Sequence, residues 1–242
     1  MLFVLTGEVQ TGKTRWLGRL AARLAAEGVR CAGVLAPGVW RPRAEGAALS
    51  AEDLHAGGRA EGAFEKLGID NVLLPCGERI PFARRADLAR DAGAFDCASQ
   101  SARAGLGWAI DDAAIARVNA HFRELATEAG AAAEGGEAKV PGESGFGAVP
   151  SDPSQAVLRP FAASLLVVDE LGRLELVRGE GLIEAMALLD RGPTPAFPHA
   201  LVVVREDLLP IARERLAPAW GVLRSIRPDE EGVDQVRAAL GV

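Results

Sequence analysis

Short apolar runs and segments of helical period alternate from the start of the chain. Residues 2–6, LFVLT, are apolar and bounded by Gly7, which predicts a buried strand. Residues 13–27 place apolar side chains at helical spacing and are followed by Gly28, so they predict a helix with a glycine at its end. Residues 30–35 return to strand character. Strand, glycine-containing loop, helix and strand together indicate a βαβ unit with parallel strands.

The same alternation returns in the second half. The apolar residues 164–168 run into Asp169 and predict a strong strand. Weaker patterns then predict two further strands and three helices: strands at 200–204 and 221–226, helices near 180–190, 206–216 and 230–240. Alternating strands and helices favour a three-layer α/β fold, with a mostly parallel sheet covered on both faces.

The middle of the chain is less regular. Residues 69–74 and 79–83 flank a Pro-Cys-Gly-Glu turn and predict an inserted β-hairpin, and a helix is expected at 112–127. Residues 84–106 show no clear pattern. Two segments poor in large apolar residues are expected to lack regular structure: an irregular excursion at 38–62 and a mobile insertion, not a domain, at 128–156. We therefore expect one domain spanning residues 1–242.

Charge narrows the classes of partner. The net charge is −6 and the isoelectric point is near 5.3. An acidic chain is a poor nonspecific ligand for nucleic acid or an anionic membrane, so we expect neither as a partner. A protein partner stays open, because nothing in the composition identifies or excludes one.

Two further patterns bear on where the chain works. The sequence has no apolar stretch near 18 residues and no basic leader before its first apolar run, so we expect neither a membrane span nor a signal peptide. Its widely spaced cysteines, Cys31, Cys76 and Cys97, form neither a disulfide framework nor a zinc motif. Both patterns favour a cytoplasmic protein.

The loop after the first strand carries the strongest chemical motif. Residues 7–14, GEVQTGKT, match G-x-x-x-x-G-K-[ST] between a predicted strand and a predicted helix. Glycines let backbone N–H groups turn inward around an anion at the helix N-terminus. Lys13, one of only three lysines in the chain, can then reach the β- and γ-phosphates, and Thr14 can face a bound Mg²⁺. The expected phosphate-binding residues are Gly7, Glu8, Val9, Gln10, Thr11, Gly12, Lys13 and Thr14.

A second motif complements this loop. An ASCE-type P-loop nucleoside triphosphatase needs a strand, beside the first, that brings a carboxylate to the metal. Residues 164–170, SLLVVDE, place Asp169 and Glu170 where such a strand ends. Asp169 is predicted to hold Mg²⁺ through water, and Glu170 to orient or deprotonate the attacking water. Lys13 and Glu170 are thus the predicted catalytic residues, and Thr14 and Asp169 the predicted metal residues.

Four segments resemble the small P-loop nucleoside triphosphatases first described in thermophiles, a family that includes the cancer-related nucleoside triphosphatase of animals. VVDELGRLEL at 167–176 is similar to the signature D-E-[IL]-G-[KR]-[ML]-E-[LF] of that family. The other resembling segments are GVLA at 33–36, GERIPFAR at 77–84 and LVVVREDLL at 201–209. The resemblance implies a RecA-like (ASCE) fold and slow, Mg²⁺-dependent hydrolysis of ATP, GTP and other nucleoside triphosphates. It also implies for Lys13, Thr14, Asp169 and Glu170 the roles given above.

Two positions depart from that family pattern. Gln10 replaces a third loop glycine, and Arg15 replaces a common threonine. Because Gln10 narrows the backbone freedom of the loop, the departure concerns the turnover rate more than binding.

Several other side chains have both a functional and a structural interpretation. Arg173 is either a γ-phosphate contact or half of a loop-stiffening pair with Glu175. Trp40 and Trp108 either stack on a base or serve packing. The three histidines, His55, His121 and His199, are isolated in sequence and indicate no metal site. Four arginines are candidates to supply positive charge to the transition state: Arg79, Arg84, Arg85 and Arg205.

Three classes of function fit these motifs. The leading one is hydrolysis of the β–γ bond of a nucleoside triphosphate. A nucleoside or small-molecule kinase is the second, although no arginine-rich lid motif is evident. The third is a nucleotide-dependent switch or assembly factor with negligible turnover until a partner binds.

Overall fold

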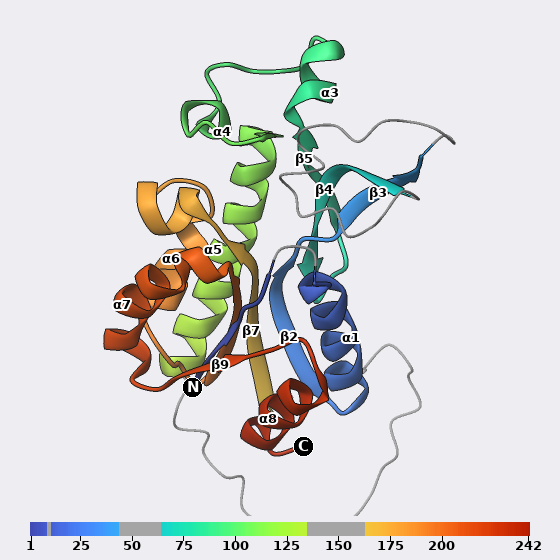
Figure 1. Cartoon of the computed structure of the whole chain (residues 1–242). Helices are drawn as coiled ribbons and strands as arrows, with labels where there is room; N and C mark the ends of the chain where they lie inside the picture. The colour runs from blue at the N-terminus through green and yellow to red at the C-terminus, as the bar shows by residue number, and fades with distance from the viewer. Residues whose placement is uncertain (9–10, 44–63, 135–162) are drawn as a thin grey trace, which may run out of the picture.

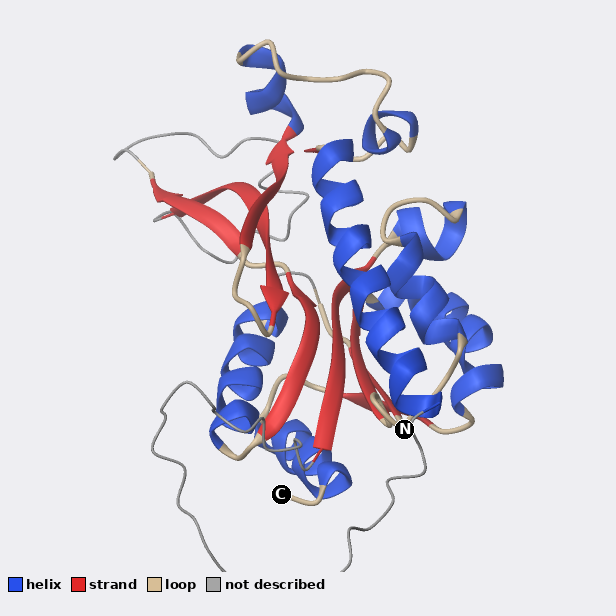
Figure 2. Cartoon of the chain, turned by 180° about the vertical axis from the view of Figure 1, so that it is seen from behind, coloured by secondary structure: helices blue, strands red, loops and turns tan. Residues whose placement is uncertain are grey.

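A nine-stranded sheet between helices runs through the computed structural model, which describes residues 1–8, 11–43, 64–134 and 163–242 (Figures 1 and 2). Its strand order is β6-β5-β4-β2-β7-β8-β1-β9, with β3 paired to β4. Helices lie on both sides of the parallel part of this sheet (Figure 2). The three-layer α/β prediction is therefore confirmed.

Adjacent strands pair in parallel through the centre of the sheet. β8 lies between β1 and β7, so the prediction that the strand ending in Asp169 lies directly beside the first strand is wrong. The central place suits β8, since its residues 200–204 are at most 1% exposed and carry no charge. The parallel strands are β2 (Val29–Leu35), β7 (Ala163–Leu171), β8 (His199–Val204), β1 (Leu2–Leu5) and β9 (Leu223–Ile226).

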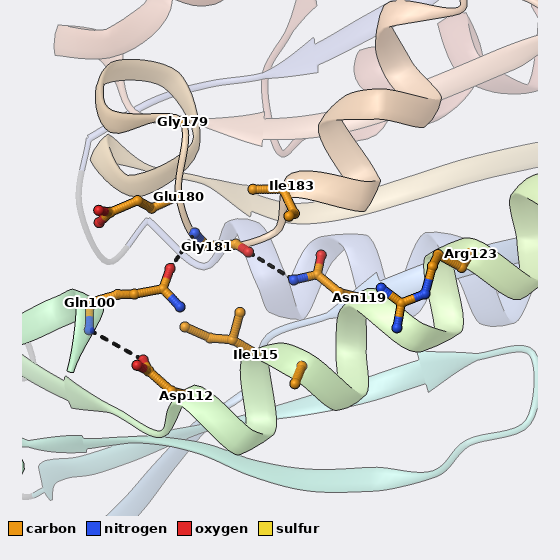
Figure 3. A pocket seen from close by; sticks show the side chains of 10 residues that line it. Gln100, Asp112, Ile115, Asn119, Arg123, Gly179, Glu180, Gly181 and Ile183 are labelled. Carbon is orange, nitrogen blue, oxygen red and sulfur yellow. Dashed lines mark hydrogen bonds between the residues drawn. The ribbon is translucent and has the colours of Figure 1, made fainter.

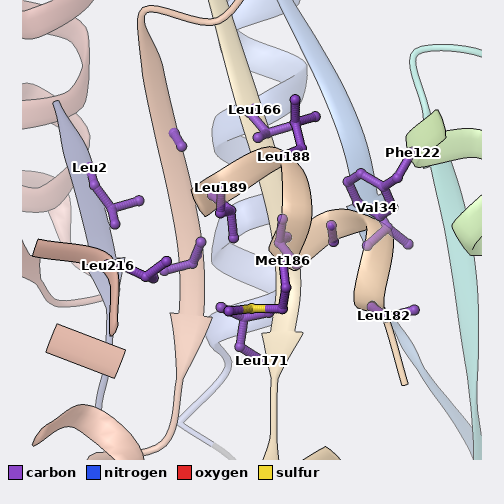
Figure 4. Close-up of a cluster of buried hydrophobic side chains, with 14 of the residues drawn as sticks. Leu2, Val34, Phe122, Leu166, Leu171, Leu182, Met186, Leu188, Leu189 and Leu216 are labelled. Atoms are coloured by element: carbon purple, nitrogen blue, oxygen red, sulfur yellow. The ribbon is translucent and has the colours of Figure 1, made fainter. Parts of the chain in front are cut away.

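Side chains of the central strands alternate between two apolar clusters. In β1, Leu2 and Val4 belong to one cluster, and Phe3 and Leu5 belong to the other. This alternation follows from the two-residue period of a strand and explains why LFVL has no polar face. Helices α5 (Asp112–Glu134), α6 (Ile183–Asp190) and α7 (Leu209–Trp220) cover the first cluster (Figure 4), while α1 (Lys13–Ala26) and α8 (Glu230–Leu240) cover the second.

Beyond β2 the sheet continues in antiparallel pairing. The predicted hairpin is confirmed as β4 (Phe64–Leu74) and β5 (Arg79–Arg85), and β4 pairs with β2. The extension is larger than predicted, because β6 (Trp108–Ile110) pairs with β5 and β3 (Gly38–Pro42) pairs with β4. The prediction of irregular structure for 38–42 is wrong, because this segment pairs with β4 and forms a strand. Residues 44–62 of that expectation lie outside the described residues.

Helix α5 is longer than the predicted 112–127. It continues to Glu134, and Ala129 in its added part is only 2% exposed. The start of the predicted mobile insertion is therefore helical, because this alanine-rich stretch keeps the helical register while Ala129 packs in the core. Residues 135–156 lie outside the described residues. None of the described helices is long and apolar enough to cross a bilayer.

Two short helices occupy the region that showed no sequence pattern. They are α3 (Ala86–Asp91) and α4 (Gln100–Arg103). The Ser99 side chain caps α4 by accepting a hydrogen bond from the Ala102 N–H. Helices this short carry too few residues to show a period in the sequence.

Gly33 allows β2 and β7 to lie close together. Its φ is +123°, and a Cβ atom placed there would lie 2.0 Å from the Val167 carbonyl oxygen. Any other residue at 33 would push these strands apart. The GVLA segment therefore sets the position of β2 relative to the strand that carries Asp169.

Candidate active site

The carboxyl ends of four parallel strands meet at one edge of the sheet, the upper edge in Figure 1. Gly7 follows β1, Ala36 follows β2 and Arg205 follows β8, while Asp169 and Glu170 are among the last three residues of β7. This edge is where open α/β sheets bind ligands. Both predicted motifs, the loop and the acidic pair, are therefore brought to the same place.

The loop between β1 and α1 is organised around Lys13. Lys13 is 8% exposed, and its Nζ donates hydrogen bonds to the carbonyl oxygens of Gly7 at 2.8 Å and Glu8 at 2.7 Å. The Thr11 hydroxyl donates to the same Glu8 carbonyl at 2.9 Å. Gly12 precedes the helix with φ +81°, a left-handed conformation that glycine adopts without strain. The ammonium of the first residue of α1 is thus bonded to the two residues at the start of the loop.

Most predicted loop residues lie in this arrangement. The exceptions are Val9 and Gln10, which lie outside the described residues. The effect expected from Gln10 on the loop therefore stays a prediction.

Charged side chains surround Lys13 at this edge. Burial lowers the pKa of Lys13, and the negative charge of Glu170 opposes that shift most strongly. Arg205 lowers the same pKa, whereas Asp169 and Glu206 raise it. The charge of Lys13 therefore interacts with charged groups of β7 and of the turn after β8. This electrostatic coupling places both motifs in one site.

Asp169 is buried, with 2% of its surface exposed, and Ala36 holds its carboxylate. The Ala36 N–H donates to Oδ2 at 3.0 Å. Burial raises the pKa of Asp169 from 3.8 to about 6, and the charge of Glu170 adds to this shift. Hydrogen bonds from the Ala36 N–H and the Thr14 side chain act in the opposite direction. Asp169 and Thr14, the two predicted metal residues, are therefore neighbours.

The buried carboxylate of Asp169 predicts a pH-dependent cost to stability. The folded-state pKa lies above the unfolded value, so the folded state holds this proton more tightly, and the penalty develops as pH rises from about 4 to about 7. In a metal chelator, Asp169→Asn should gain on the order of 2–3 kcal/mol in unfolding free energy relative to wild type over that range. Urea unfolding at pH 4 and pH 7 measures this. A difference between the two proteins that does not change with pH contradicts the expectation.

Glu170 is paired with Arg205 at the mouth of the site. The Arg205 Nε donates to Glu170 Oε1 at 2.9 Å, and both side chains are partly exposed. Of the four arginines predicted as candidates for the transition-state charge, Arg205 lies at this edge. Arg79 pairs with Asp70, Arg85 pairs with Glu65 and Asp87, and Arg84 is exposed on β5.

Glu175 organises the chain after β7 and does not pair with Arg173. Its carboxylate accepts N–H groups from Gly172 at 2.9 Å and Leu182 at 3.0 Å. Arg173 instead lies 3.9 Å from Asp207, with both side chains exposed. Of the two alternatives for Arg173, the pair with Glu175 is therefore wrong, because backbone amides satisfy Glu175 in the buried interior, and the contact with a γ-phosphate stays a prediction.

Replacing Glu175 by alanine should destabilise the fold. It would leave the buried N–H of Leu182 and the partly buried N–H of Gly172 without an acceptor, at a cost of about 2–4 kcal/mol in unfolding free energy. The exposed Glu214 on α7 provides the matched control, since Glu214→Ala should change stability by less than about 0.5 kcal/mol. Equal stability losses in the two variants, measured by urea unfolding, would refute this role.

The chemistry of Thr14 and Asp169 fits a magnesium ion. Mg²⁺ prefers oxygen ligands, keeps several waters and takes only one or two protein ligands beside substrate phosphates. A hydroxyl next to a buried carboxylate matches that requirement. Among the described residues, no cluster of three or more His, Cys, Asp or Glu side chains could hold a metal alone. Any ion here therefore needs ligands from a bound phosphate or from water.

A separate hollow of about 360 Å³ lies where α4 and α5 meet the turn before α6 (Figure 3). Three of its polar side chains, Gln100, Asp112 and Asn119, bind backbone groups. Gln100 accepts the Gly181 N–H at 2.8 Å, and Asn119 donates to the Gly181 carbonyl at 2.9 Å. We interpret it as a joint between elements, since none of its lining residues belongs to the loop or the acidic pair: Gln100, Asp112, Ile115, Ala116, Asn119, Arg123, Gly179, Glu180, Gly181 and Ile183.

Two residues near the site were not predicted from sequence. The Ala36 N–H fixes Asp169, and a backbone donor leaves no sequence signal. Lys66 on β4 is near enough for Glu170, Asp169 and Arg205 to act on its pKa. The available signal for Lys66 was its scarcity, as one of three lysines in 242 residues.

Comparison with known proteins adds little to this picture. No protein-family model matches the chain, and no curated protein matches it. Among solved structures it is similar to one described as the "Solution Structure of a Human Cancer-Related Nucleoside Triphosphatase". The identity is 17%, the TM-score is 0.49, and the match covers 99% of this chain and 94% of that one. A likeness at this level supports no conclusion about activity.

Proposed function

We propose that this chain is a Mg²⁺-dependent nucleoside triphosphatase with a RecA-like (ASCE) P-loop fold and loose base selectivity. One observation carries the proposal: Lys13 and Thr14 at the start of α1 lie at the same sheet edge as Asp169 and Glu170 at the end of β7. The Thr14 side chain hydrogen-bonds Asp169, and the charges of both carboxylates act on Lys13. Either pair alone is a common pattern. Together they supply a phosphate cradle, oxygen ligands for a cation, and a carboxylate that can act on water.

Binding would begin at the N-terminus of α1. The Lys13 ammonium donates to two loop carbonyls and has three donors, so it can bind phosphate oxygens by exchanging these partners. The free N–H groups at the helix start favour the same anion. Thr14 and Asp169 would hold Mg²⁺, which when bound supplies positive charge to the β- and γ-phosphate oxygens.

Hydrolysis would then use Glu170. Its carboxylate takes a proton from a water molecule, whose oxygen forms a bond to the γ-phosphorus. The bond from that phosphorus to the β–γ bridging oxygen breaks, and the electron pair stays on the nucleoside diphosphate. Lys13 stabilises charge at the bridging and γ-phosphate oxygens. The products are the diphosphate, inorganic phosphate and one proton.

A panel of nucleoside triphosphates with Mg²⁺ tests the proposal. Each is incubated with the protein, with and without nucleosides or other hydroxyl acceptors, and free phosphate is measured. The proposal expects phosphate release from several bases without an acceptor. Transfer that occurs only with an acceptor indicates the kinase class instead, and absence of both rejects the enzyme.

One observation favours the switch class as a second candidate. The Arg205–Glu170 ion pair occupies one oxygen of the proposed base. A base held in this way would act slowly until the arginine moves, as binding of a protein partner could bring about. An intrinsic rate near the ~10⁻⁴ s⁻¹ of unassisted GTPases, increased by such a partner, would support that class.

A further inference from the structure

A lysine on the antiparallel extension lies near the acidic pair of the site. Lys66 lies on β4, opposite Trp40 on β3. Its Nζ lies 4.9 Å from the ring centroid of Trp108 on β6 and 6.0 Å from that of Trp40. Cations at such distances over an indole face are attracted to it. Three strands of the extension thus position one ammonium group.

The two indoles orient Lys66 without neutralising it. Within the described part of the chain, Lys66 forms no hydrogen bond or ion pair beside these ring contacts. On the neighbouring side-chain row of the same strands, the cations are neutralised, because Glu65 pairs with Arg41 at 2.6 Å and lies 3.6 Å from Arg85. The charge of Lys66 is therefore available to an anion.

The position of Lys66 relative to the acidic pair gives that anion a place. Burial lowers the pKa of Lys66, while the charges of Glu170 and Asp169 raise it and that of Arg205 lowers it further. The same three charges act on the pKa of Lys13. In Figure 1 the β3–β4 ribbon rises beyond the end of β2, above the N-terminal end of α1. The two lysines therefore approach the acidic pair from different elements, Lys13 from the helix and Lys66 from the extension.

We propose that Lys66, held between Trp40 and Trp108, contacts the γ-phosphate of the bound nucleoside triphosphate and stabilises the charge that develops there. The inference rests on the proposed function, since it assigns a contact residue to the terminal phosphate of the same nucleotide. It gives the role that sequence analysis sought among the arginines to a lysine within the chain.

The chemistry favours the γ-phosphate over the rest of the nucleotide. The loop and Lys13 bind the phosphates from the α1 side, whereas the carboxylates beside Lys66 are those assigned to the metal and the attacking water. In the terminal transfer, charge spreads over the γ-phosphate oxygens, where a fixed cation is most effective. Lys66 breaks and forms no bond in this step. It lowers the barrier by its charge alone.

The test compares Lys66→Met with wild type in binding and in turnover. The binding probes are a nucleoside diphosphate and the triphosphate analogue with a nitrogen at the β–γ bridge, each with Mg²⁺. Wild type should prefer the analogue. Lys66→Met should weaken the analogue about 10-fold, leave the diphosphate within about 2-fold, and lower kcat about 10²–10³-fold. Lys66→Arg should restore part of kcat, because a guanidinium also stacks on indoles.

Arg41→Ala is the matched control, since it removes a cation from β3 of the same extension, where Arg41 pairs with Glu65. It should behave as wild type in both assays. If Lys66→Met weakens both nucleotides equally, or lowers only the unfolding temperature, Lys66 is structural and the proposal is overturned. Unchanged analogue binding and kcat overturn it as well.

The binding arm separates this proposal from the proposed function. If wild-type protein releases no phosphate, hydrolysis fails. The ratio of analogue to diphosphate affinity in Lys66→Met then still decides whether Lys66 contacts the terminal phosphate.

Discussion

Glu170→Gln is expected to bind nucleoside triphosphate as tightly as wild type and to release phosphate about 10²–10⁴-fold more slowly. Glutamine keeps the shape of the side chain but cannot accept a proton at pH 7. It also keeps a carbonyl oxygen for the Arg205 Nε, which now donates to Glu170 Oε1. Because the substitution removes the group that accepts the proton from water and leaves the phosphate-binding loop intact, kcat should drop while the binding constant stays unchanged.

Glu206→Gln is the control for that experiment. Glu206 lies at the same edge and its charge also acts on Lys13, so the variant repeats the change in charge without touching the proposed base. Its kcat should stay within about threefold of wild type, the range of a small surface electrostatic change. Phosphate release from Glu170→Gln at the wild-type rate would show that the base is wrongly assigned.

Lys13→Ala is expected to weaken nucleotide binding at least about 100-fold, and turnover should be lost with it. The ammonium is a buried cation, bonded to Gly7 and Glu8. Its removal takes away both the charge that faces the phosphates and the link that closes the loop. Fluorescent nucleotide titration with Mg²⁺ measures the loss.

Arg19→Ala serves as the control for Lys13, since Arg19 is an exposed cation on the same helix. It should bind nucleotide within about twofold of wild type, as expected for an isolated surface charge. Saturable binding by Lys13→Ala at wild-type affinity would remove the phosphate loop from the site.

Local patterns in the sequence were enough to predict the elements that carry the chemistry. The apolar runs of β1 and β7 are buried on both faces, so their composition alone marks them as strands. Each apolar run ends where polar residues begin. The loop with Lys13 follows the first run, and Asp169 follows the second. The direction shared by parallel strands then brought these ends to one edge.

Long-range pairing explains what the sequence did not predict. β3, with a glycine and a proline at its ends, is a strand because β4 pairs with it. The place of β8 between β1 and β7 depends on pairing across the whole sheet. A local pattern carries no information about a partner that is distant in sequence.

Side-chain partners followed the same rule. A pair of Glu175 with Arg173, two residues earlier, was one of two alternatives, but the Glu175 carboxylate binds the N–H of Leu182 instead. Only the fold distinguishes Arg205 and Lys66 from the other cations, because it brings both near Glu170. Their charges alone gave no indication of position.

Isotope transfer from heavy-oxygen water tests the central claim most directly. The protein is incubated with a nucleoside triphosphate and Mg²⁺ in labelled water, and both products are analysed by mass spectrometry. Attack of water at the γ-phosphorus predicts one heavy oxygen in each released phosphate and none in the nucleoside diphosphate. Label in the diphosphate, or no phosphate above a Glu170→Gln control, would contradict it.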